Sequence, residues 1–509
     1  MTIASVAAAG RRRAPDGLGW YLGGALAAVV VAATALLTSP LVVPVLVAGA
    51  VAVYLAAFKP KVFALVGVLA VVLSTLVQAA LGSIAGYTDE AVVVLALVAF
   101  TTRRLVTRGR LVAFPGAAFF LVFIGLGLTS SFVNAVPLTI TAEALLLITK
   151  GLLFAFALAQ LEWTEKDLAV LARAGAVAIV VMLLSGLVNL AAPGLSAAAT
   201  NAIQRAGVGG LPALTGLFEH PAAFGRFCAI LAVGALVYGV VVRSSWANVA
   251  LVTASVGLAM LTFQVKSLVG MIVALAAVGF RLARPVTLWA VLALGPLVGL
   301  LLWPPLSGFV GADIQQYVVQ DSARLSLTLG SFDVANQHAP LGAGFGRYGS
   351  YPASEHYSPE YVSRHFEGVF GLGRDEKGMF LNDTQWPALI GETGWFGALA
   401  FLLGVIAVFV LLLRRTSEDE PTLVRWIRIT GVGWLTLLLV ESIAGPVFVS
   451  APSYPFVFAA AGIVASFASA AREREREARR PLVTVPAEVT TPEVTTPEVT
   501  PTAPPGAVR

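Results

Sequence analysis

The chain has 509 residues, of which 58% are hydrophobic and only 12% are charged, and its formal net charge is +5. Soluble domains average roughly 45–50% apolar and about 25% charged residues, so the composition excludes an ordinary soluble protein and predicts an integral membrane protein. Because membrane proteins concentrate arginine and lysine on their cytoplasmic loops, the basic balance does not indicate a nucleic-acid partner.

The apolar residues form long blocks rather than short alternating strands, which favours membrane-spanning helices over a barrel. The first block follows three arginines and lacks a small-residue cleavage site, so we expect an uncleaved helix. We therefore expect an all-α polytopic membrane protein with about 12–14 transmembrane helices, since proline and glycine can split a span. In chain order the predicted spans are 19–38, 41–58, 62–85, 89–101, 111–132, 141–161, 168–192, 222–242, 247–264, 267–283, 285–304, 388–413, 429–448 and 452–470.

The positive charges orient these spans. With the N-terminus inside, the basic clusters at 59–61, 103–110, 243, 281–284, 414–428 and 472–480 all fall on the cytoplasmic side. We expect a multi-pass protein of the cell membrane with both termini cytoplasmic. The predicted organisation is a cytoplasmic N-terminus (1–18), N-terminal helices (19–192), central helices with an outward loop (193–304, loop 193–221), a long extracytoplasmic loop (305–387), C-terminal helices (388–470) and a disordered cytoplasmic tail (471–509).

The tail opens with "REREREARR", which we expect to be a mixed-charge helix extension, and continues as the Pro/Thr repeat "AEVTTPEVTTPEVTPTAPP", which cannot bury a core. Its threonines are candidates for a kinase or for a cytoplasmic partner. The single cysteine, Cys228, lies inside an apolar block, so the chain forms no internal disulfide.

Ionisable residues inside predicted spans are costly and tend to line a cavity. The predicted outer half contains such residues in "GLFEHPAAFGRF" (Glu219, His220 and Arg226) and in "FQVKSLVG" (Lys266), and two others are Lys150 and Glu441. The alternative for each is a charge at a helix end that reaches the interface, or a paired structural charge.

The long outer loop carries Arg324 on an amphipathic stretch, then "PLGAGFG" and Arg347. Since no strand precedes Gly342, Gly344 and Gly346, we expect close backbone packing or a turn rather than a nucleotide site. The next segment, "EHYSPEYVSRHFEGVFGLGRDEKG", resembles an exposed lid. Its candidate ligands match no established metal spacing, so we expect no metal or other cofactor; they are Glu355, His356, His365 and Glu367.

The order of these features resembles the O-antigen ligase and O-antigen polymerase superfamily of membrane glycan transferases. The resemblance covers about residues 200 to 415: "TGLFEHPAAFG", then "VKSLVGMIVAL", then Arg324 before "PLGAGFG", then "NDTQWPALIGETGWFG". It implies a metal-independent inverting glycosyltransferase at the outer face of the plasma membrane. Such an enzyme moves a glycan from an undecaprenyl-pyrophosphate donor to a hydroxyl of an acceptor glycan or glycolipid. The implied partners are these two substrates and the lipid bilayer.

The resemblance also implies roles for individual residues. Arginine and lysine would meet the charge on the leaving pyrophosphate, and the candidates are Arg324, Arg226, Lys266 and Arg205. The family's catalytic histidine corresponds to Asp383 here, and Lys266 stands at a turn that usually carries arginine. We expect Asp383 to act as the base and Glu392 to be a catalytic, structural or orienting carboxylate. The remaining candidates, for acceptor binding or the lid, are His220, Arg347, His356 and His365.

Several alternatives stay open at this point. Asp383 or Thr384 can instead cap the helix that begins near Trp386, because both residue types are preferred caps. The buried charges also suit a secondary transporter or flippase for a lipid-linked or anionic substrate. A non-catalytic envelope scaffold is a third class. The sequence shows no obvious internal repeat, and the long outer loop is unusual for a transporter.

Overall fold

The computed structural model describes residues 42–81, 86–202, 205, 207, 211–282, 323–374 and 380–478. Within these residues every regular element is helical, and the chain is an all-α polytopic membrane protein. Seven of the described helices are long and apolar enough to span a membrane: α7 (Leu138–Ala159), α8 (Glu165–Ala191), α10 (Pro221–Val241), α12 (Val265–Leu282), α17 (Trp386–Leu413), α18 (Thr422–Glu441) and α19 (Tyr454–Ala478).

The other described helices of the bundle are α2 (Val42–Phe58), α3 (Pro60–Val72), α4 (Ser74–Leu81), α5 (Thr88–Arg108), α6 (Ala117–Val133), α9 (Pro193–Thr200) and α11 (Trp246–Met260). Each predicted span within the described residues coincides at least in part with a helix. The predicted span 62–85 is divided between α3 and α4, which separate at Leu73. The predicted spans 19–38 and 285–304, the N-terminus 1–18 and most of the tail lie outside the described residues.

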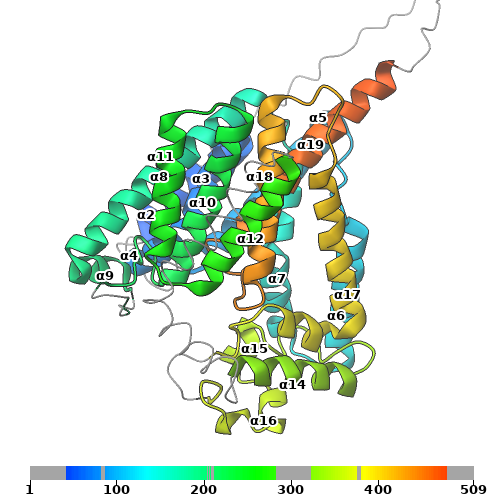
Figure 1. Ribbon diagram of the computed structural model, residues 1–509. Coiled ribbons are helices and arrows are strands. Elements are labelled where there is room, and N and C mark those ends of the chain that lie inside the picture. Colours follow the sequence, from blue (N-terminus) through cyan, green and yellow to red (C-terminus); the bar gives the residue numbers. More distant parts are fainter. Residues whose placement is uncertain are drawn as a thin grey trace, which may run out of the picture.

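The helices stand side by side as a bundle, with α7 against α19, α12 against α18, α10 against α11 and α6 against α17 (Figure 1). Phenylalanine rings fill part of the core between α6, α17 and α19. Phe120 and Phe123 each meet Phe401 edge to face, with ring centroids 5.6 and 5.1 Å apart. Such buried aromatic pairs contribute about 0.5–1.5 kcal/mol beyond their buried area.

The helix ends follow local sequence signals. Thr164 and Asp167 form a reciprocal capping box at the start of α8, where each side chain satisfies a backbone N–H of the first turn. α10 begins with Pro221 at its first position, which needs no N–H partner there. α5 ends at Gly109, whose φ of 67° is the left-handed conformation that glycine adopts without strain.

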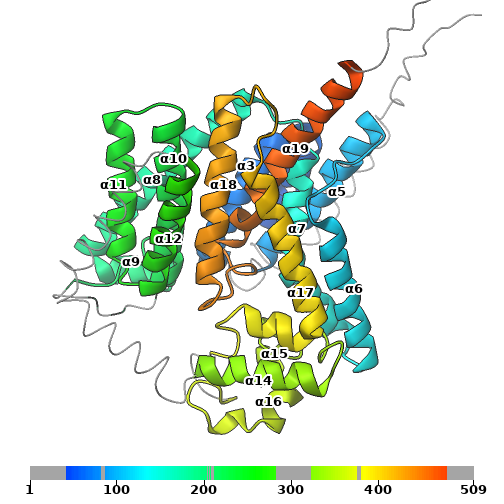
Figure 2. The same cartoon turned by 45° about the vertical axis from the view of Figure 1, so that its right-hand side comes forward.

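The long loop predicted at 305–387 contains folded structure in its described part. Helices α14 (Ala323–Gln337), α15 (Tyr351–Glu355) and α16 (Pro359–Ser363) form a layer across one end of the bundle (Figures 1 and 2). The layer has its own core, in which the rings of Tyr361 and Phe366 stack with centroids 5.8 Å apart. The C-terminal end of α19 lies at the opposite end of the bundle.

The last three helices differ from the predicted spans. α18 covers residues 422–441 rather than 429–448, because buried Arg428 pairs with Glu420 through two hydrogen bonds of 2.7 Å and the helix can therefore include it. Residues 442–453 then run as turns before α19, and they are partly buried, with Ile443 exposed. α19 continues through the predicted boundary at 471 to Ala478, so that boundary is too early, and the mixed-charge helix extension is confirmed.

Helix α17 is interrupted at Gly394, whose φ of 65° and ψ of −176° are not helical. A Cβ atom at this position would lie 2.6 Å from the carbonyl oxygen of Pro340 and 2.9 Å from the backbone nitrogen of Gly342. Glycine therefore allows the glycine-rich segment to pack against the helix at the break. In Figure 2 the first part of α17 lies beside the α14–α16 layer, and the longer second part runs up the bundle.

Candidate functional site

A cluster of charged side chains lies where α10, α12 and α18 approach the α14–α16 layer. Arg226, in the second turn of α10, donates from Nε to the Glu441 carboxylate at the end of α18. Its Nη1 donates to Ser453 Oγ at 3.1 Å. The Glu441 side chain is fully buried, and its Oε1 accepts no hydrogen bond from the described residues. Arg226 is thus half of a buried pair that still has an unused acceptor.

Lys266 is the second residue of α12 and extends toward the same place. Its Nζ donates to the carbonyl of Ala444 at 2.8 Å, and it makes no ion pair among the described residues. Arg226 Nη2 and Lys266 Nζ lie 3.4 and 3.6 Å from the point where a Cβ of Gly445 would stand. The two cations therefore share one location beside Gly445, a residue that sequence reasoning did not single out.

Arg324 and Asp383 form a second pair. Arg324, in the first turn of α14, donates from Nε at 2.9 Å and also from Nη2 to Asp383 Oδ2. Asp383 Oδ1 accepts no hydrogen bond from the described residues. Both side chains stay accessible, at 22% for Arg324 and 24% for Asp383. Asp383 therefore carries one oxygen engaged by a cation and one oxygen available to another group.

The capping alternative for Asp383 and Thr384 is wrong. α17 begins after Gln385, and no side chain caps its first turn. The Gln385 backbone N–H instead donates to the carbonyl of Ser442 at 3.2 Å, and its side-chain oxygen accepts from the backbone N–H of Phe448 at 3.2 Å. The approach to α17 is held by the buried turns after α18, which is a long-range contact that local residue preference does not reveal.

His220 is the residue before α10, and its Nδ1 accepts the backbone N–H of Ala222 at 3.0 Å. With Nδ1 accepting, the neutral ring carries its proton on Nε2 and presents a donor, not a base. Burial lowers the pKa of His220 to about 4, and the positive charge of Arg205 adds to this effect. The same electrostatic environment includes Lys266, Arg226 and Asp383.

Arg205 is exposed and makes no ion pair among the described residues. Arg324 and Asp383 lie within electrostatic range of Lys266. The structure therefore brings together the four cations that the resemblance singled out, with Asp383 and Glu441 as the two acids. Because four positive charges face two negative ones and His220 is neutral, the cluster carries a net positive charge that suits an anionic ligand.

Glu392 lies apart from this cluster, inside the first part of α17, and is 5% exposed. Its Oε1 accepts from Gly346 N at 2.9 Å, from Tyr348 N at 3.3 Å and from Ser350 Oγ at 2.5 Å. These contacts hold the segment that follows "PLGAG" against α17, which is the geometry of an orienting carboxylate. Glu392 makes no ion pair with the cations of the cluster among the described residues.

The predicted packing role of the glycines is confirmed. Gly342, Gly344 and Gly346 have φ of 81°, 97° and 79°, and a Cβ on any of them would approach a neighbouring atom to 2.4–2.7 Å. Ser131 Oγ of α6 accepts the backbone N–H of Phe345 at 2.8 Å, so the segment is held from two sides. It is a structural wedge between α6 and α17.

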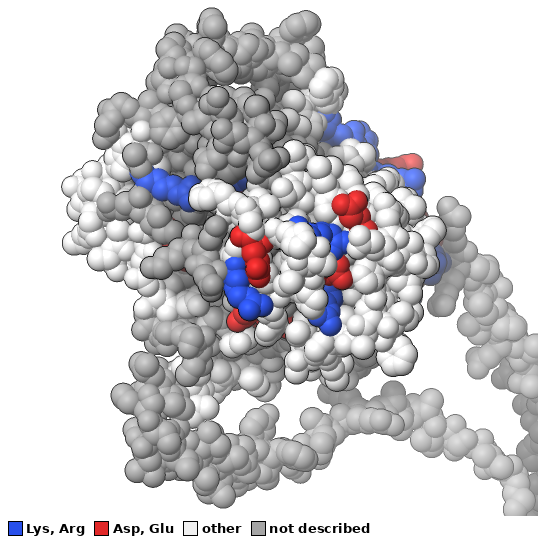
Figure 3. Space-filling view, turned by 90° about the horizontal axis from the view of Figure 1, so that it is seen from below, with Lys and Arg blue, Asp and Glu red and all other residues white. Residues whose placement is uncertain are grey.

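The remaining candidates do not join the cluster. His356 and His365 are exposed on the α14–α16 layer, and Arg347 is partly buried in the glycine-rich segment; within the described residues none has a side-chain hydrogen bond or ion pair. Figure 3 shows basic and acidic side chains close together on this end of the molecule. No group of three or more His, Cys, Asp or Glu side chains in the described chain is placed to hold one metal ion.

Two other polar residues, Lys150 and His338, also have partners in the structure. Lys150 is a paired charge, with Nζ 2.6 Å from Asp89 and 2.9 Å from Glu90. His338, which sequence reasoning missed, lies 3.0 Å from both Asn134 Oδ1 and Glu360 Oε1. Its position between the amphipathic stretch and the glycine-rich segment was the available signal. No protein-family model matches the chain, and no curated protein matches it in sequence.

Proposed function

We propose that the chain is a membrane glycosyltransferase that takes a glycan from a polyprenyl-pyrophosphate donor and passes it to an acceptor hydroxyl. The observation that carries the proposal is the convergence of Arg226, Lys266 and Arg205 at one end of the bundle with Arg324 of the folded layer. A pyrophosphate is the leaving group whose growing negative charge such a cluster would stabilise. The order of motifs supports the same reading.

Lys266 and Arg205 are the cations best suited to the phosphates, because neither is engaged by a carboxylate among the described residues. Arg226 is held in place by Glu441 and Ser453, and its Nη2 remains near Lys266. A fixed guanidinium beside a lysine ammonium offers both a planar fork and a point charge to phosphate oxygens. These groups would hold the donor before the bond to the sugar breaks.

Asp383 is the proposed base. Its Oδ1 would accept the proton of the acceptor hydroxyl while that oxygen bonds to the anomeric carbon. The bond from this carbon to the pyrophosphate oxygen breaks at the same time, and the leaving group keeps the electron pair, so the anomeric configuration inverts. Arg324 orients the carboxylate through Oδ2 and lies close enough to Lys266 to contribute to the phosphate site.

The test is a lipid-linked glycan profile of a deletion strain that carries each variant. Asp383→Asn keeps the shape of the side chain but cannot take a proton, so we expect transfer to fall by a factor on the order of 10² to 10⁴ with normal protein levels. Asp333→Asn, on the exposed face of α14, is the matched control and should transfer normally. Accumulated full-length chains would indicate a ligase, and single repeat units a polymerase. Wild-type transfer by Asp383→Asn would contradict the proposal.

The proposed orientation places the α14–α16 layer outside the cell and both termini in the cytoplasm. It rests on the basic clusters at 59–61, 103–110, 243 and 414–428, which the preference of arginine and lysine for cytoplasmic loops places inside the cell. Cysteines introduced at exposed Ser363 in α16 and exposed Glu418 between α17 and α18 test it. An impermeant thiol reagent should label only the first in intact cells, because native Cys228 is buried. Labelling of Glu418→Cys alone would reverse the orientation.

The second candidate is a transporter of lipid-linked or anionic substrates. It is favoured by the partly buried, non-helical residues 442–453 between α18 and α19, since irregular backbone inside a bundle commonly surrounds a transport site. Purified protein in vesicles separates the two. Movement of a lipid-linked glycan across the bilayer without transfer to an acceptor would support the transporter and contradict the transferase.

A further inference from the structure

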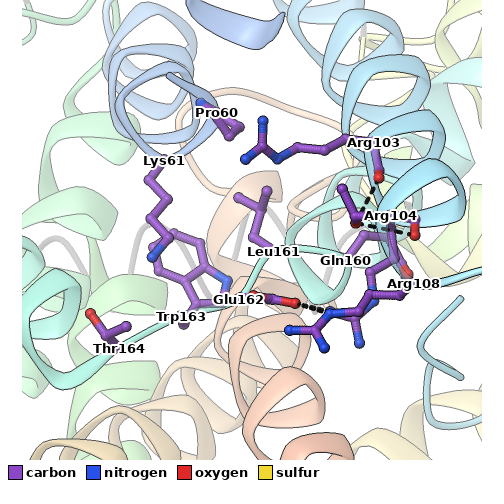
Figure 4. A pocket seen from close by; sticks show the side chains of 11 residues that line it. Pro60, Lys61, Arg103, Arg104, Arg108, Gln160, Leu161, Glu162, Trp163 and Thr164 are labelled. Carbon is purple, nitrogen blue, oxygen red and sulfur yellow. Dashed lines mark hydrogen bonds and ion pairs between the residues drawn. The ribbon is translucent and has the colours of Figure 1, made fainter. Parts of the chain in front are cut away.

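A second basic site lies at the opposite end of the bundle, far from the α14–α16 layer. It is a pocket of about 560 Å³ between the start of α3, the end of α5 and the connection between α7 and α8 (Figure 4). Four of its lining residues are basic and one is acidic: Lys61, Arg103, Arg104 and Arg108, with Glu162. The pocket therefore has an excess of positive charge that the proposed transfer reaction does not use.

The acid in the pocket is already shared. Glu162 Oε1 accepts from Arg108 Nε at 2.6 Å and from Arg104 Nη1 at 3.1 Å. The Arg108 guanidinium lowers the pKa of the Glu162 carboxyl, so this acid is ionised at neutral pH. Lys61 is engaged by Asp167 at 2.6 Å. Glu162 thus serves two arginines, of which Arg104 also lies 3.9 Å from Glu473 of α19, and none of these acids contacts Arg103.

Two donors in the pocket lack partners. Arg103 is exposed, and its side chain forms no hydrogen bond or ion pair with the described residues. In Figure 4 its guanidinium extends toward Pro60 of α3. Arg104 is 7% exposed, and its buried Nε also has no hydrogen-bond partner in the described chain. A buried donor without a partner is unfavourable, so a ligand that accepts from Arg104 Nε would bind favourably, and exposed Arg103 adds a further donor.

Phosphate is the anion that fits such a set of donors, because its oxygens accept several guanidinium hydrogen bonds at once. The location favours a phosphate that belongs to a lipid. The pocket lies at the end of the spanning helices α7 and α8, which is the level at which lipid headgroups meet the protein. On α3, directly after Lys61, the side chains of Val62, Val66 and Leu69 are 48%, 43% and 54% exposed among the described residues, which gives acyl chains an apolar surface beside the pocket.

We infer that this pocket binds the phosphate headgroup of an anionic phospholipid, with Arg103 and Arg104 as the principal donors and Lys61 and Arg108 at its edge. The acyl chains lie along the exposed face of α3. Basic pockets between membrane helices recognise anionic headgroups in this way. The site is independent of the proposed transfer chemistry, which lies at the other end of the bundle.

The test is a titration of the purified full chain with phosphatidylglycerol, with bound lipid counted by native mass spectrometry. Arg103→Gln should weaken binding about tenfold or more, the loss expected for a charged hydrogen bond. Arg425→Gln removes the same charge from an exposed residue at the same end, outside the pocket, and should bind like the wild type. Glu162→Gln removes the competing carboxylate and should strengthen binding.

Two further ligands identify the source of the phosphate. Phosphatidylcholine, which has a phosphate but no net charge, should bind more weakly than phosphatidylglycerol, and inorganic phosphate should compete only weakly with the lipid. Equal losses in Arg103→Gln and Arg425→Gln would show general surface attraction and overturn the inference. Inorganic phosphate that binds as tightly as the lipid would overturn the assignment to a phospholipid.

Discussion

Buried and exposed arginines of the bundle are treated differently, whichever end they occupy. Arg226 at one end and Arg428 at the other are buried within helices, and each is paired with a carboxylate on or beside α18, Glu441 or Glu420. Arg103, by contrast, is exposed and has no partner among the described residues. Burial decides the difference, because a charge removed from water must be paired.

The two buried arginines, Arg226 and Arg428, differ in whether their polar atoms all have partners. The Arg428 guanidinium is fully used, since two of its nitrogens bond Glu420 and the third donates to the carbonyl of Leu412 at 3.0 Å. The Arg226 pair leaves Glu441 Oε1 without a partner in the described chain and lies beside Lys266. An ion pair whose polar atoms all have partners stabilises the structure. An ion pair with an unpaired oxygen next to a further cation is suited to bind a ligand.

The largest expected effect is on stability. Glu441→Leu leaves Arg226 buried without its acid and should destabilise the protein by about 3–5 kcal/mol, and Glu420→Leu should do the same to Arg428. Replacing both partners with apolar residues should recover most of the loss in each case. Thermal unfolding in detergent measures this.

The two double variants then differ in function. Arg226→Met with Glu441→Leu should lose glycan transfer, whereas Arg428→Met with Glu420→Leu should retain it. If both double variants transfer alike, the two buried pairs have the same role, and the distinction between a structural pair and a site pair fails.

A smaller effect is expected at Arg324. Its Nε and Nη2 both bond Asp383, which lysine cannot reproduce, so Arg324→Lys should lower transfer about 10- to 100-fold, and Arg324→Ala should lower it further. Rates of transfer to a soluble acceptor measure this, with Arg425→Lys as the control at the other end. Full activity of Arg324→Lys would show that only the charge matters.

The smallest effect concerns pH. All four histidines of the chain, at 220, 338, 356 and 365, lie at the site end or on the layer that covers it. The pKa of His220 is about 4 in the folded protein against an ordinary value of 6.5, so the unfolded chain binds its proton first as the pH falls. The folded state therefore loses stability between pH 6.5 and 4, by no more than about 1.4 kcal/mol per pH unit.

His220→Asn retains a capping side chain but does not titrate, so it should reduce this loss. The comparison of unfolding temperatures at pH 7 and pH 5 tests it in both proteins. An unchanged difference between the two pH values would place the acid sensitivity in other groups.

Most of the helices could be predicted, because about 20 consecutive apolar residues are sufficient to identify a spanning helix. The ends of α18 could not be predicted. Hydropathy excludes charged Arg428 from a spanning helix, whereas the folded protein buries it against Glu420. Likewise the break in α17 depends on residues that pack at Gly394 from another part of the chain.

The sequence was sufficient to predict which charged residues form the site, but not which residues they pair with. Arg226, Lys266 and Arg324 stood out as costly charges, yet their partners are 215, 178 and 59 residues away in sequence. No local pattern indicates such pairs. The role of Asp383 in binding Arg324 and the absence of a cap at α17 therefore required the tertiary structure.

The glycine-rich wedge has a consequence for biosynthesis. Ser130 and Ser131 of α6 bond the backbone of Gly342 and Phe345, which lie 212 and 214 residues later. At roughly 5–20 residues per second, α6 is made about 10 to 40 s before its partners exist. During that interval these hydroxyls must bond within their own helix or to other groups. The wedge therefore completes the bundle late. A nascent chain that ends before the glycine-rich segment has made α6 but not the residues that join α6 to α17.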